Sequence, residues 1–334
     1  MDPVTITTPG PDVQNEAPTL HVSLSRVGVT GVEKIIRIDR EGGQQLFSAT
    51  LECFVDLGPK QKGAHMSRFE EVVNDAIGEV ILGGSAFRAE TLAERIAVIV
   101  RDRQDALRAE VTLKARYPEE KPAPVSGIPT QEIYTMLGSA VASEHGTRRL
   151  VGVTAQGMTA CPCAQQLVAA KARERLGEEG FGEQDVERIL EAVPVATHNQ
   201  RGLGTLHLGF PEGDETEIDA MDLVAIVEDS MSSEIYELMK RSDEGTVVEK
   251  AHRRPRFVED CVREAIRGVL DRYPDLPGEV FVSARQENLE TIHQHNVVAE
   301  RFGLLGELRQ EIASGDHLPH HTSMREWMDG AGRR

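Results

Sequence analysis

The chain lacks the features that mark several specialised classes of protein. Its net charge is −18, from 37 Lys and Arg against 55 Asp and Glu, so no basic excess favours non-specific binding of nucleic acid or anionic membranes. Its 334 residues contain no apolar run near the ~20 residues that cross a bilayer. The first 18 residues contain no basic segment followed by an apolar one, which argues against a secretory signal and favours a disordered tail.

Cysteine is scarce and shows no disulfide pattern. The four cysteines are Cys53, Cys161, Cys163 and Cys261, which are too scattered in a chain of this length to form a disulfide framework. We therefore expect reduced thiols and a cytoplasmic location. Cys53 and Cys261 fall on the apolar faces of a predicted strand and a predicted helix, so both are expected to be small buried core residues.

Several familiar motifs are missing as well. The sequence has no Walker motif, Rossmann glycine pattern, zinc-protease helix or Ser-His-Asp signature. Each half of the chain can be interpreted as strand, strand, helix, helix, strand, strand, although no residue-level repeat relates the halves. We predict an α+β protein with a tail at 1–18, a first half at 19–145, a second half at 146–313 and a loose tail at 314–334, which contains His320 and His321.

Hydrophobic periodicity indicates the elements. Alternation of apolar and polar residues predicts strands, and apolar residues at helical spacing predict helices. In the first half we expect strands at 46–57 and 107–117, and helices from Ser67, where a capping box with Glu70 begins, and at 89–103. The second half is expected to contain strands at 149–154, 204–210, 279–285 and 292–298, amphipathic helices at 218–240 and 257–273, and a helical excursion at 164–193.

The chemistry centres on Cys161-Pro162-Cys163, at the junction between an apolar strand and a helix. Such a junction displays side chains at the rim of a sheet. A thiol with scattered imidazoles and carboxylates indicates a catalytic metal site, because structural zinc modules use closely spaced ligand pairs. The structural alternative is two small residues in a tight turn. Candidate partners follow downstream: His198, Glu244, and the pair His293 and His295, which a strand would place on one face.

A basic stretch precedes the first predicted helix. Lys60, Lys62, His65 and Arg68 are held at its N-terminus, where unpaired N–H groups and the helix dipole favour an anion. The alternative is a solvated basic loop. From these residues alone, the sequence predicts a metalloenzyme with a cradle for an anionic substrate.

Seven blocks in family order resemble the type IB GTP cyclohydrolase I family. They are KGAHMSRF at 62–69, PVSGI at 124–128, CPC at 161–163, HNQR at 198–201, KRSDE at 240–244, FVED at 257–260 and IHQH at 292–295. The resemblance implies a tandem tunnelling (T-) fold, with antiparallel sheets and pairs of helices packed on one face. It also implies a homotetramer with active sites between subunits, GTP as substrate, and a divalent metal: zinc, manganese or iron(II).

The same resemblance implies roles for individual residues. The metal ligands would be Cys161, His198, Glu244 and His293, and Glu259 would hold the guanine edge. A carboxylate suits that edge because it accepts from both the ring N–H and the exocyclic amine. Further catalytic or phosphate-binding residues would be His65, His295, Arg68 and Arg201, with Cys161 counted among the catalytic residues.

The expected reaction is hydrolytic opening of the guanine imidazole ring, with release of formate, to give 7,8-dihydroneopterin triphosphate for folate or pterin biosynthesis. The excursion at 164–193 separates CPC from HNQR and is more similar to an archaeal, iron(II)-dependent branch. The product of that branch is 7,8-dihydroneopterin 2′,3′-cyclic phosphate. Two further alternatives are a T-fold nitrile reductase, against which the metal-type histidines argue, and a non-catalytic metal-binding protein.

Overall fold

The computed structural model describes residues 12–40, 43–79 and 88–330, and the chain forms two compact units. Unit 1 comprises Met1–Ala115, Gly138–Leu150 and Pro211–Gly213, and unit 2 comprises Arg116–Leu137, Val151–Phe210 and Asp214–Arg334. These units interleave along the chain, because long strands contribute residues to both. The division into halves at 19–145 and 146–313 follows chain order instead and stays a prediction.

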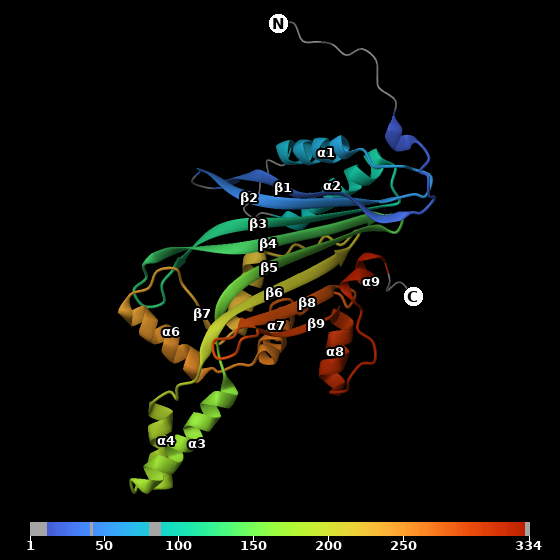
Figure 1. The fold of residues 1–334 in the computed structure, drawn as a ribbon. Helices are drawn as coiled ribbons and strands as arrows, with labels where there is room; N and C mark the ends of the chain where they lie inside the picture. The colour runs from blue at the N-terminus through green and yellow to red at the C-terminus, as the bar shows by residue number, and fades with distance from the viewer. Residues whose placement is uncertain (1–11, 41–42, 80–87, 331–334) are drawn as a thin grey trace. The chain divides into compact units, whose positions relative to one another are not determined.

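Unit 1 is an antiparallel sheet with two helices (Figure 1). Helix α1 contacts strand β1, and helix α2 contacts strand β2. The predicted alternation in β2 is confirmed, since its apolar face from Ala49 to Leu57 is at most 4% exposed and includes Cys53. The elements are β1 Leu24–Arg40, β2 Gly43–Leu57, α1 Met66–Glu79, α2 Ala89–Gln104 and the first part of β3 Arg108–Pro122.

Unit 2 also combines an antiparallel sheet with helices, which confirms the α+β class. Strands β6, β8 and β9 follow one another in antiparallel pairs, and β7 pairs with β5. Helix α7 packs on β8, β9 and α5. The strands are β4 Pro129–Ser143, β5 Gly146–Ala160, β6 Asn199–Pro211, β7 Ser233–Glu234, β8 Phe281–Leu289 and β9 Val297–Leu304. The helices beside them are α5 Ala220–Ser230, α6 Arg241–Arg253 and α7 Val258–Arg272.

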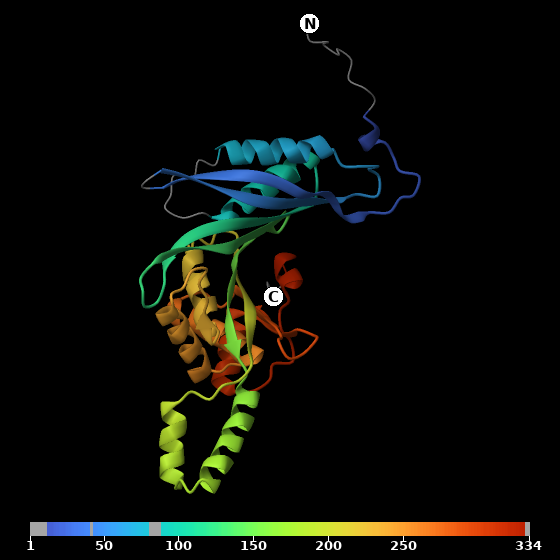
Figure 2. The same ribbon diagram turned by 60° about the vertical axis from the view of Figure 1, so that its left-hand side comes forward.

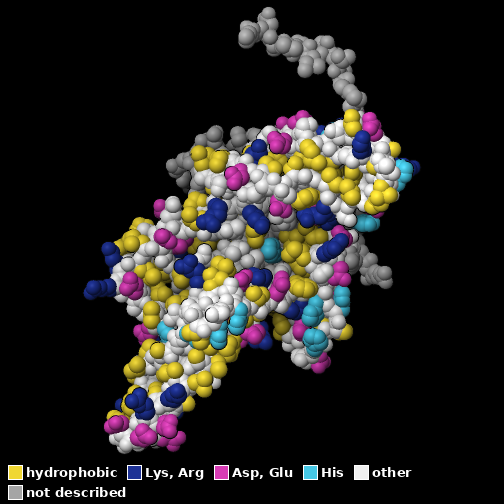
Figure 3. Space-filling view, viewed as in Figure 1, with side chains coloured by type: hydrophobic (Ala, Val, Ile, Leu, Met, Phe, Trp, Pro, Cys, Tyr) yellow, Lys and Arg dark blue, Asp and Glu magenta, His cyan; other side chains and the backbone are white. Residues whose placement is uncertain are grey.

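The predicted helical excursion is a hairpin of α3 Pro162–Glu178 and α4 Glu183–Ala192. It extends away from the strands of unit 2 (Figure 2). The turn between the helices contains Gly180 at φ 88°, a left-handed conformation that glycine adopts without strain. Hydrophobic side chains line its surface (Figure 3), and Leu167 is 63% exposed.

The helix predicted at 218–240 is wrong beyond Ser230, where α5 ends. The Ser230 hydroxyl donates to the Val227 carbonyl at 2.7 Å, and the Ser232 hydroxyl accepts from the Ala160 N–H at 3.1 Å. Serine side chains compete for backbone hydrogen bonds and so disfavour a helix interior. The chain leaves the helix here and pairs with β5 through Ser233 and Glu234.

The strand predicted at 292–298 is also wrong for most of its length. Strand β8 continues to Leu289, and the pairing of Asn288 with Val297 leaves a connecting loop between β8 and β9. Polar residues such as Asn296 fit a loop, because their side chains bond nearby backbone groups. His293 and His295 therefore lie in a loop and not on one face of a strand.

The C-terminal segment differs from the loose tail expected at 314–334. After α8 Leu305–Ser314, the chain forms α9 Met324–Met328. Trp327 is 1% exposed, its ring lies 5.5 Å from that of Phe281, and its Nε1 donates to the Glu279 carbonyl. One tryptophan buries enough apolar surface to hold a polar segment in place.

At the other end of the chain, residues 1–11 of the expected N-terminal tail lie outside the described ranges, and Val13–Asn15 forms a 3₁₀ turn. Within those ranges no helix combines the length and the apolar character needed to cross a membrane.

Candidate functional site

Cys161 lies where β5 ends and α3 begins. It is the N-cap residue of α3, and its Sγ accepts a hydrogen bond from the Ala164 N–H at 3.5 Å. Pro162 occupies the first helical turn, where its missing N–H costs nothing. Cys161 is half-buried and Cys163 is exposed, so the two thiols occupy different environments.

The start of β6 lies directly beside this junction. The Cys161 N–H donates to the His198 carbonyl at 3.1 Å, and the Thr197 hydroxyl donates to the Cys161 carbonyl at 2.9 Å. Residues separated by the whole α3–α4 hairpin therefore meet at its base. This contact brings together two of the predicted ligands, Cys161 and His198.

Imidazoles and a carboxylate surround His198. Its ring centroid lies 6.5 Å from that of His293, which in turn stacks on His295 at 5.3 Å. The Nδ1 atom of His198 lies 3.0 Å from Gln200 Oε1 and 3.7 Å from Glu290 Oε2. The loop between β8 and β9 thus places His293 and Glu290 near His198, and His295 beside His293.

Glu290, in the same loop, is a carboxylate that the sequence analysis did not select as a ligand. Its side chain is 6% exposed, and its Oε2 atom is buried without a hydrogen-bond partner in the described ranges. An unsatisfied buried acceptor costs free energy, and a cation would offset that cost. Thiol, imidazole and carboxylate donors at this place fit a divalent transition metal.

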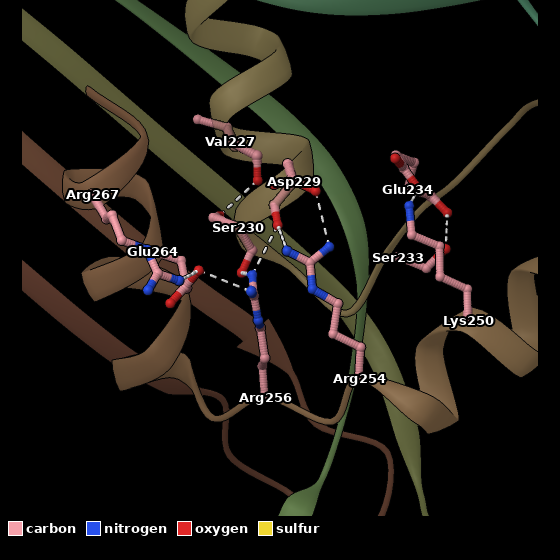
Figure 4. A network of polar contacts seen from close by, with 10 residues as sticks. All are labelled: Val227, Asp229, Ser230, Ser233, Glu234, Lys250, Arg254, Arg256, Glu264 and Arg267. Atoms are coloured by element: carbon pink, nitrogen blue, oxygen red, sulfur yellow. Dashed lines mark hydrogen bonds and ion pairs between the residues drawn. The ribbon is translucent and has the colours of Figure 1, made fainter. Parts of the chain in front are cut away.

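A polar network fixes the backbone that leads into Cys161. The Ala160 carbonyl accepts from the Arg256 N–H at 3.0 Å, and its N–H donates to Ser232. The Arg256 guanidinium donates to the Asp229 and Ser230 carbonyls, at 2.8 and 2.6 Å, at the C-terminus of α5 (Figure 4). It also pairs with Glu264 at 2.9 Å, and burial lowers the pKa of Arg256. One arginine therefore links α5, α7 and the strand end that carries the thiol.

The sequence blocks PVSGI at 124–128 and KRSDE at 240–244 meet at the N-terminus of α6. The Asp243 carboxylate is fully buried and accepts bonds from the Val125 and Ser126 N–H groups and the Ser126 hydroxyl, all at 2.7–2.8 Å, and from the Lys240 N–H. Burial alone would raise the pKa of Asp243, but these bonds outweigh it and hold the pKa far below its usual range. Glu244, the next residue, is exposed in the first turn of α6.

A cleft of about 1230 Å³ lies entirely in unit 2, and Asn199 and Gln200, the residues that follow His198, are part of its lining. Arg201 lines it and is exposed. On its wall the Glu228 carboxylate accepts from Lys121 at 2.7 Å and from the Tyr134 hydroxyl at 2.9 Å. Burial raises the pKa of Glu228, and Lys121 opposes that rise. The volume is ample for a nucleotide-sized ligand.

Other predicted residues lie elsewhere. His65 and Arg68 belong to unit 1, where Gln104 bonds the backbone of His65 and Arg68 donates to the Arg103 carbonyl. Glu259 is exposed in the first turn of α7 and lines a separate cavity of about 440 Å³. In the described ranges, no three ligand atoms within 4.8 Å include one from Cys161, His198, Glu244 or His293, so the ligand set stays a prediction.

The antiparallel strands and the helices beside them place the chain in the α+β class. The solved structures of uricase from Arthrobacter globiformis and of a hyper-thermostable uricase mutant are similar in fold. Their TM-scores are 0.51 and 0.50 at 7% and 6% identity, with 89% and 91% of this chain and 96% of each uricase covered. At such low identity the likeness concerns the fold alone.

Sequence comparison is more specific. The family model for type I GTP cyclohydrolase folE2 matches residues 11–299. GTP cyclohydrolase MptA of Methanococcus aeolicus is 42% identical over 308 residues, 90% of this chain and 99% of the relative. The MptA of Methanocaldococcus jannaschii is 41% identical over 309 residues, 91% and 98%. The chain therefore belongs to the type I GTP cyclohydrolase folE2 family, and the prediction of a hydrolase of the GTP cyclohydrolase class is confirmed.

Proposed function

We propose that this protein opens the guanine imidazole ring of GTP and releases formate, with 7,8-dihydroneopterin 2′,3′-cyclic phosphate as its product. The observation that carries the proposal is the 42% identity across 99% of the MptA of Methanococcus aeolicus. The α3–α4 hairpin between Cys161 and His198 supports the same branch, which was the alternative to the triphosphate in the sequence analysis.

The proposed reaction balances. One water is consumed as C8 of the purine leaves as formate and the ring closes again with carbons from the sugar. The hydroxyl beside the triphosphate on the pterin's own side chain then attacks the phosphorus nearest the pterin. This attack closes the cyclic phosphate and displaces pyrophosphate. The product keeps one of three phosphates, so pyrophosphate appears in equal amount with formate. A triphosphate product would instead give formate without pyrophosphate.

The residues of unit 2 support this chemistry. We propose that Cys161, His198 and His293 hold a divalent ion together with a carboxylate, either Glu244 or the orphaned Glu290. Such an ion supplies a water of lowered pKa. His295 stacks on His293 and is placed to move a proton near neutral pH. In the adjoining cleft, the Arg201 guanidinium is suited to bind phosphate oxygens.

We further propose a tandem tunnelling fold assembled as a homotetramer, with active sites between subunits. The cavity that Glu259 lines and the cleft that Arg201 lines have no lining residue in common. Glu259 of one copy can therefore complete the cleft of another. Mixing a Glu259→Gln variant with a Cys161→Ala variant tests this, because mixed assemblies contain intact composite sites and regain turnover. No recovery after subunit exchange would place Glu259 in the same chain's site.

Metal-stripped protein incubated anaerobically with GTP and Fe(II), Mn(II) or Zn(II) tests the reaction, with products identified by mass spectrometry. We expect the cyclic phosphate, formate and pyrophosphate, with Fe(II) giving the highest rate. If the triphosphate forms without pyrophosphate, the product is that of the type IB enzymes and the cyclic phosphate is wrong. No consumption of GTP with any of the metals would contradict the proposal and favour a binding protein.

A further inference from the structure

A second group of metal-ligand side chains lies outside the candidate site. Glu311, His317 and His321 each offer one ligand atom, and these atoms all lie within 4.8 Å of one another. It is the single group of this kind in the described part of the chain. Figure 3 shows histidine side chains gathered over the α8 region, apart from those near the base of α3.

Local structure brings the three residues together. Helix α8 ends at Ser314. Its C-cap residue, Gly315, has a left-handed φ of 71°, and its N–H donates to the Glu311 carbonyl at 2.8 Å. On the far side of the turn, Thr322 donates through its hydroxyl and its N–H to Glu307, at 2.6 and 3.2 Å. Trp327 then anchors the following helix. The segment with both histidines is therefore held against α8 at each end.

The side chains within this turn are incompletely satisfied. The Nε2 atom of His321 is buried without a hydrogen-bond partner in the described ranges, an arrangement that costs free energy. The His317 and His321 rings lie 5.6 Å apart at an interplanar angle of 71°, an edge-to-face contact. This contact satisfies no hydrogen bond of His321 Nε2, and a nitrogen of each ring lies within 4.8 Å of a Glu311 carboxylate oxygen.

Arg301 holds the third side chain. Its guanidinium donates to Glu311 Oε2 at 2.7 Å, and this bond lowers the pKa of Glu311. A partner that orients a ligating carboxylate is typical of metal sites. A carboxylate has two oxygens, so the ion pair leaves one for a cation.

We propose that Glu311, His317 and His321 bind a divalent transition-metal ion, for which Zn²⁺ is the probe, at a site separate from Cys161 and His198. Two imidazoles and a carboxylate are a known zinc ligand set with one position open to water. Ligand atoms about 2.1 Å from a tetrahedral zinc lie about 3.4 Å apart, so the present group closes by at most about 1.4 Å. The ion clamps the C-terminal segment onto α8. This inference goes beyond the proposed function and does not depend on GTP turnover.

The test uses full-length, metal-stripped protein in a Cys161→Ala background, which removes the thiol of the first site. Zn²⁺ is titrated against a chromophoric chelator, and the unfolding midpoint is measured with and without Zn²⁺. We expect His317→Ala, an exposed position, to lose one bound Zn²⁺ per chain and to abolish the rise in Tm that Zn²⁺ gives the parent. Glu311→Gln should weaken binding at least tenfold. His320→Ala, the exposed neighbouring histidine, is the matched control and should bind as the parent does.

Unchanged zinc stoichiometry and affinity in His317→Ala would overturn the proposal. Equal losses in His317→Ala and His320→Ala would overturn it too, because they would show adventitious chelation by tail histidines. Unfolding midpoints of the metal-free variants identify any that fail to fold, and Co²⁺ spectra of the folded variants then decide. A tetrahedral Co²⁺ spectrum in the parent that His317→Ala loses supports the site, and its persistence in that variant contradicts it.

Discussion

Two histidine clusters in unit 2 are built in opposite ways. The cluster at Cys161 and His198 draws its residues from the end of β5, the start of β6 and the loop after β8. The cluster at Glu311 and His321 comes from one helix and the turn that follows it. Only the second has ligand atoms from three side chains within 4.8 Å, among the residues that the structure describes.

The difference shows how each site depends on the fold. The local cluster needs a helix end and two anchors, Glu307 and Trp327. The dispersed cluster needs strand pairing, a hairpin base and the Arg256 network to bring its parts near one another. We expect metal binding to order the dispersed cluster more than the local one, because its ligand atoms do not lie within 4.8 Å of one another.

Replacing Cys161 should give the largest effect. Cys161→Ala removes the half-buried thiol next to His198, and we expect GTP turnover to fall by more than about 100-fold with a parallel loss of bound metal, since even outer-shell partners cost 10–100-fold. Cys163→Ala is the matched control, because its exposed thiol lies in the same junction. Steady-state rates and metal analysis of both variants decide the matter, and full activity in Cys161→Ala would rule out this site.

The orphaned carboxylate should give the next effect. Glu290→Gln keeps the shape of the side chain but removes its charge near His198, so we expect metal affinity and turnover to fall about 10–100-fold. The control is Glu287→Gln on β8, whose carboxylate is already paired with Arg285. If Glu290→Gln is fully active while Glu244→Gln is inactive, Glu244 is the carboxylate that matters.

Trp327→Ala should affect one histidine cluster and leave the other unchanged. Truncating this buried ring costs about 3 kcal/mol of unfolding free energy if unit 2 unfolds as one unit, as for other aromatic-to-alanine changes in cores. It should also weaken Zn²⁺ binding at Glu311 and His321 while leaving GTP turnover by the remaining folded protein intact. Denaturant unfolding and zinc titration measure both, and Trp327→Phe is the milder control. Equal damage to both clusters would show that they are not independent.

Sequence reasoning succeeded where burial follows local periodicity. The stripe from Phe69 to Ala76 and that from Val258 to Val269 predicted helices that the structure contains. It failed at 218–240, where Ser233 pairs with the distant strand β5, and at 292–298, where the chain forms a loop until Val297 pairs with the preceding strand β8. Periodicity within a segment does not show which partner competes for its backbone.

Some residues of the candidate site could be predicted from the sequence, and others could not. The sequence itself singled out Cys161 and His198, the family resemblance added a role as metal ligands, and the hydrogen bond between their backbones joins residues that the hairpin separates in sequence. No sequence pattern marks the unsatisfied oxygen of Glu290, because it arises from burial by other elements. His321 was expected in a loose tail, and no sequence pattern marks the burial of its Nε2 atom.

His207 on β6, a histidine outside both clusters, should give the smallest effect. Its ring packs against Gly152, and burial lowers the pKa of His207 to about 4. The unfolded chain binds a proton near pH 6.5 whereas the folded chain does not, so stability is complete above about pH 6.5 and falls as the pH drops toward 4. Because the ring keeps partial exposure, we expect the unfolding free energy to fall by about 1–2 kcal/mol, less than the whole change in pKa would give.

The variant His207→Gln should remove that share of the acid sensitivity, measured by denaturant unfolding at pH 7, 5.5 and 4.5. Parallel pH curves for the variant and the parent would show that His207 does not titrate on unfolding.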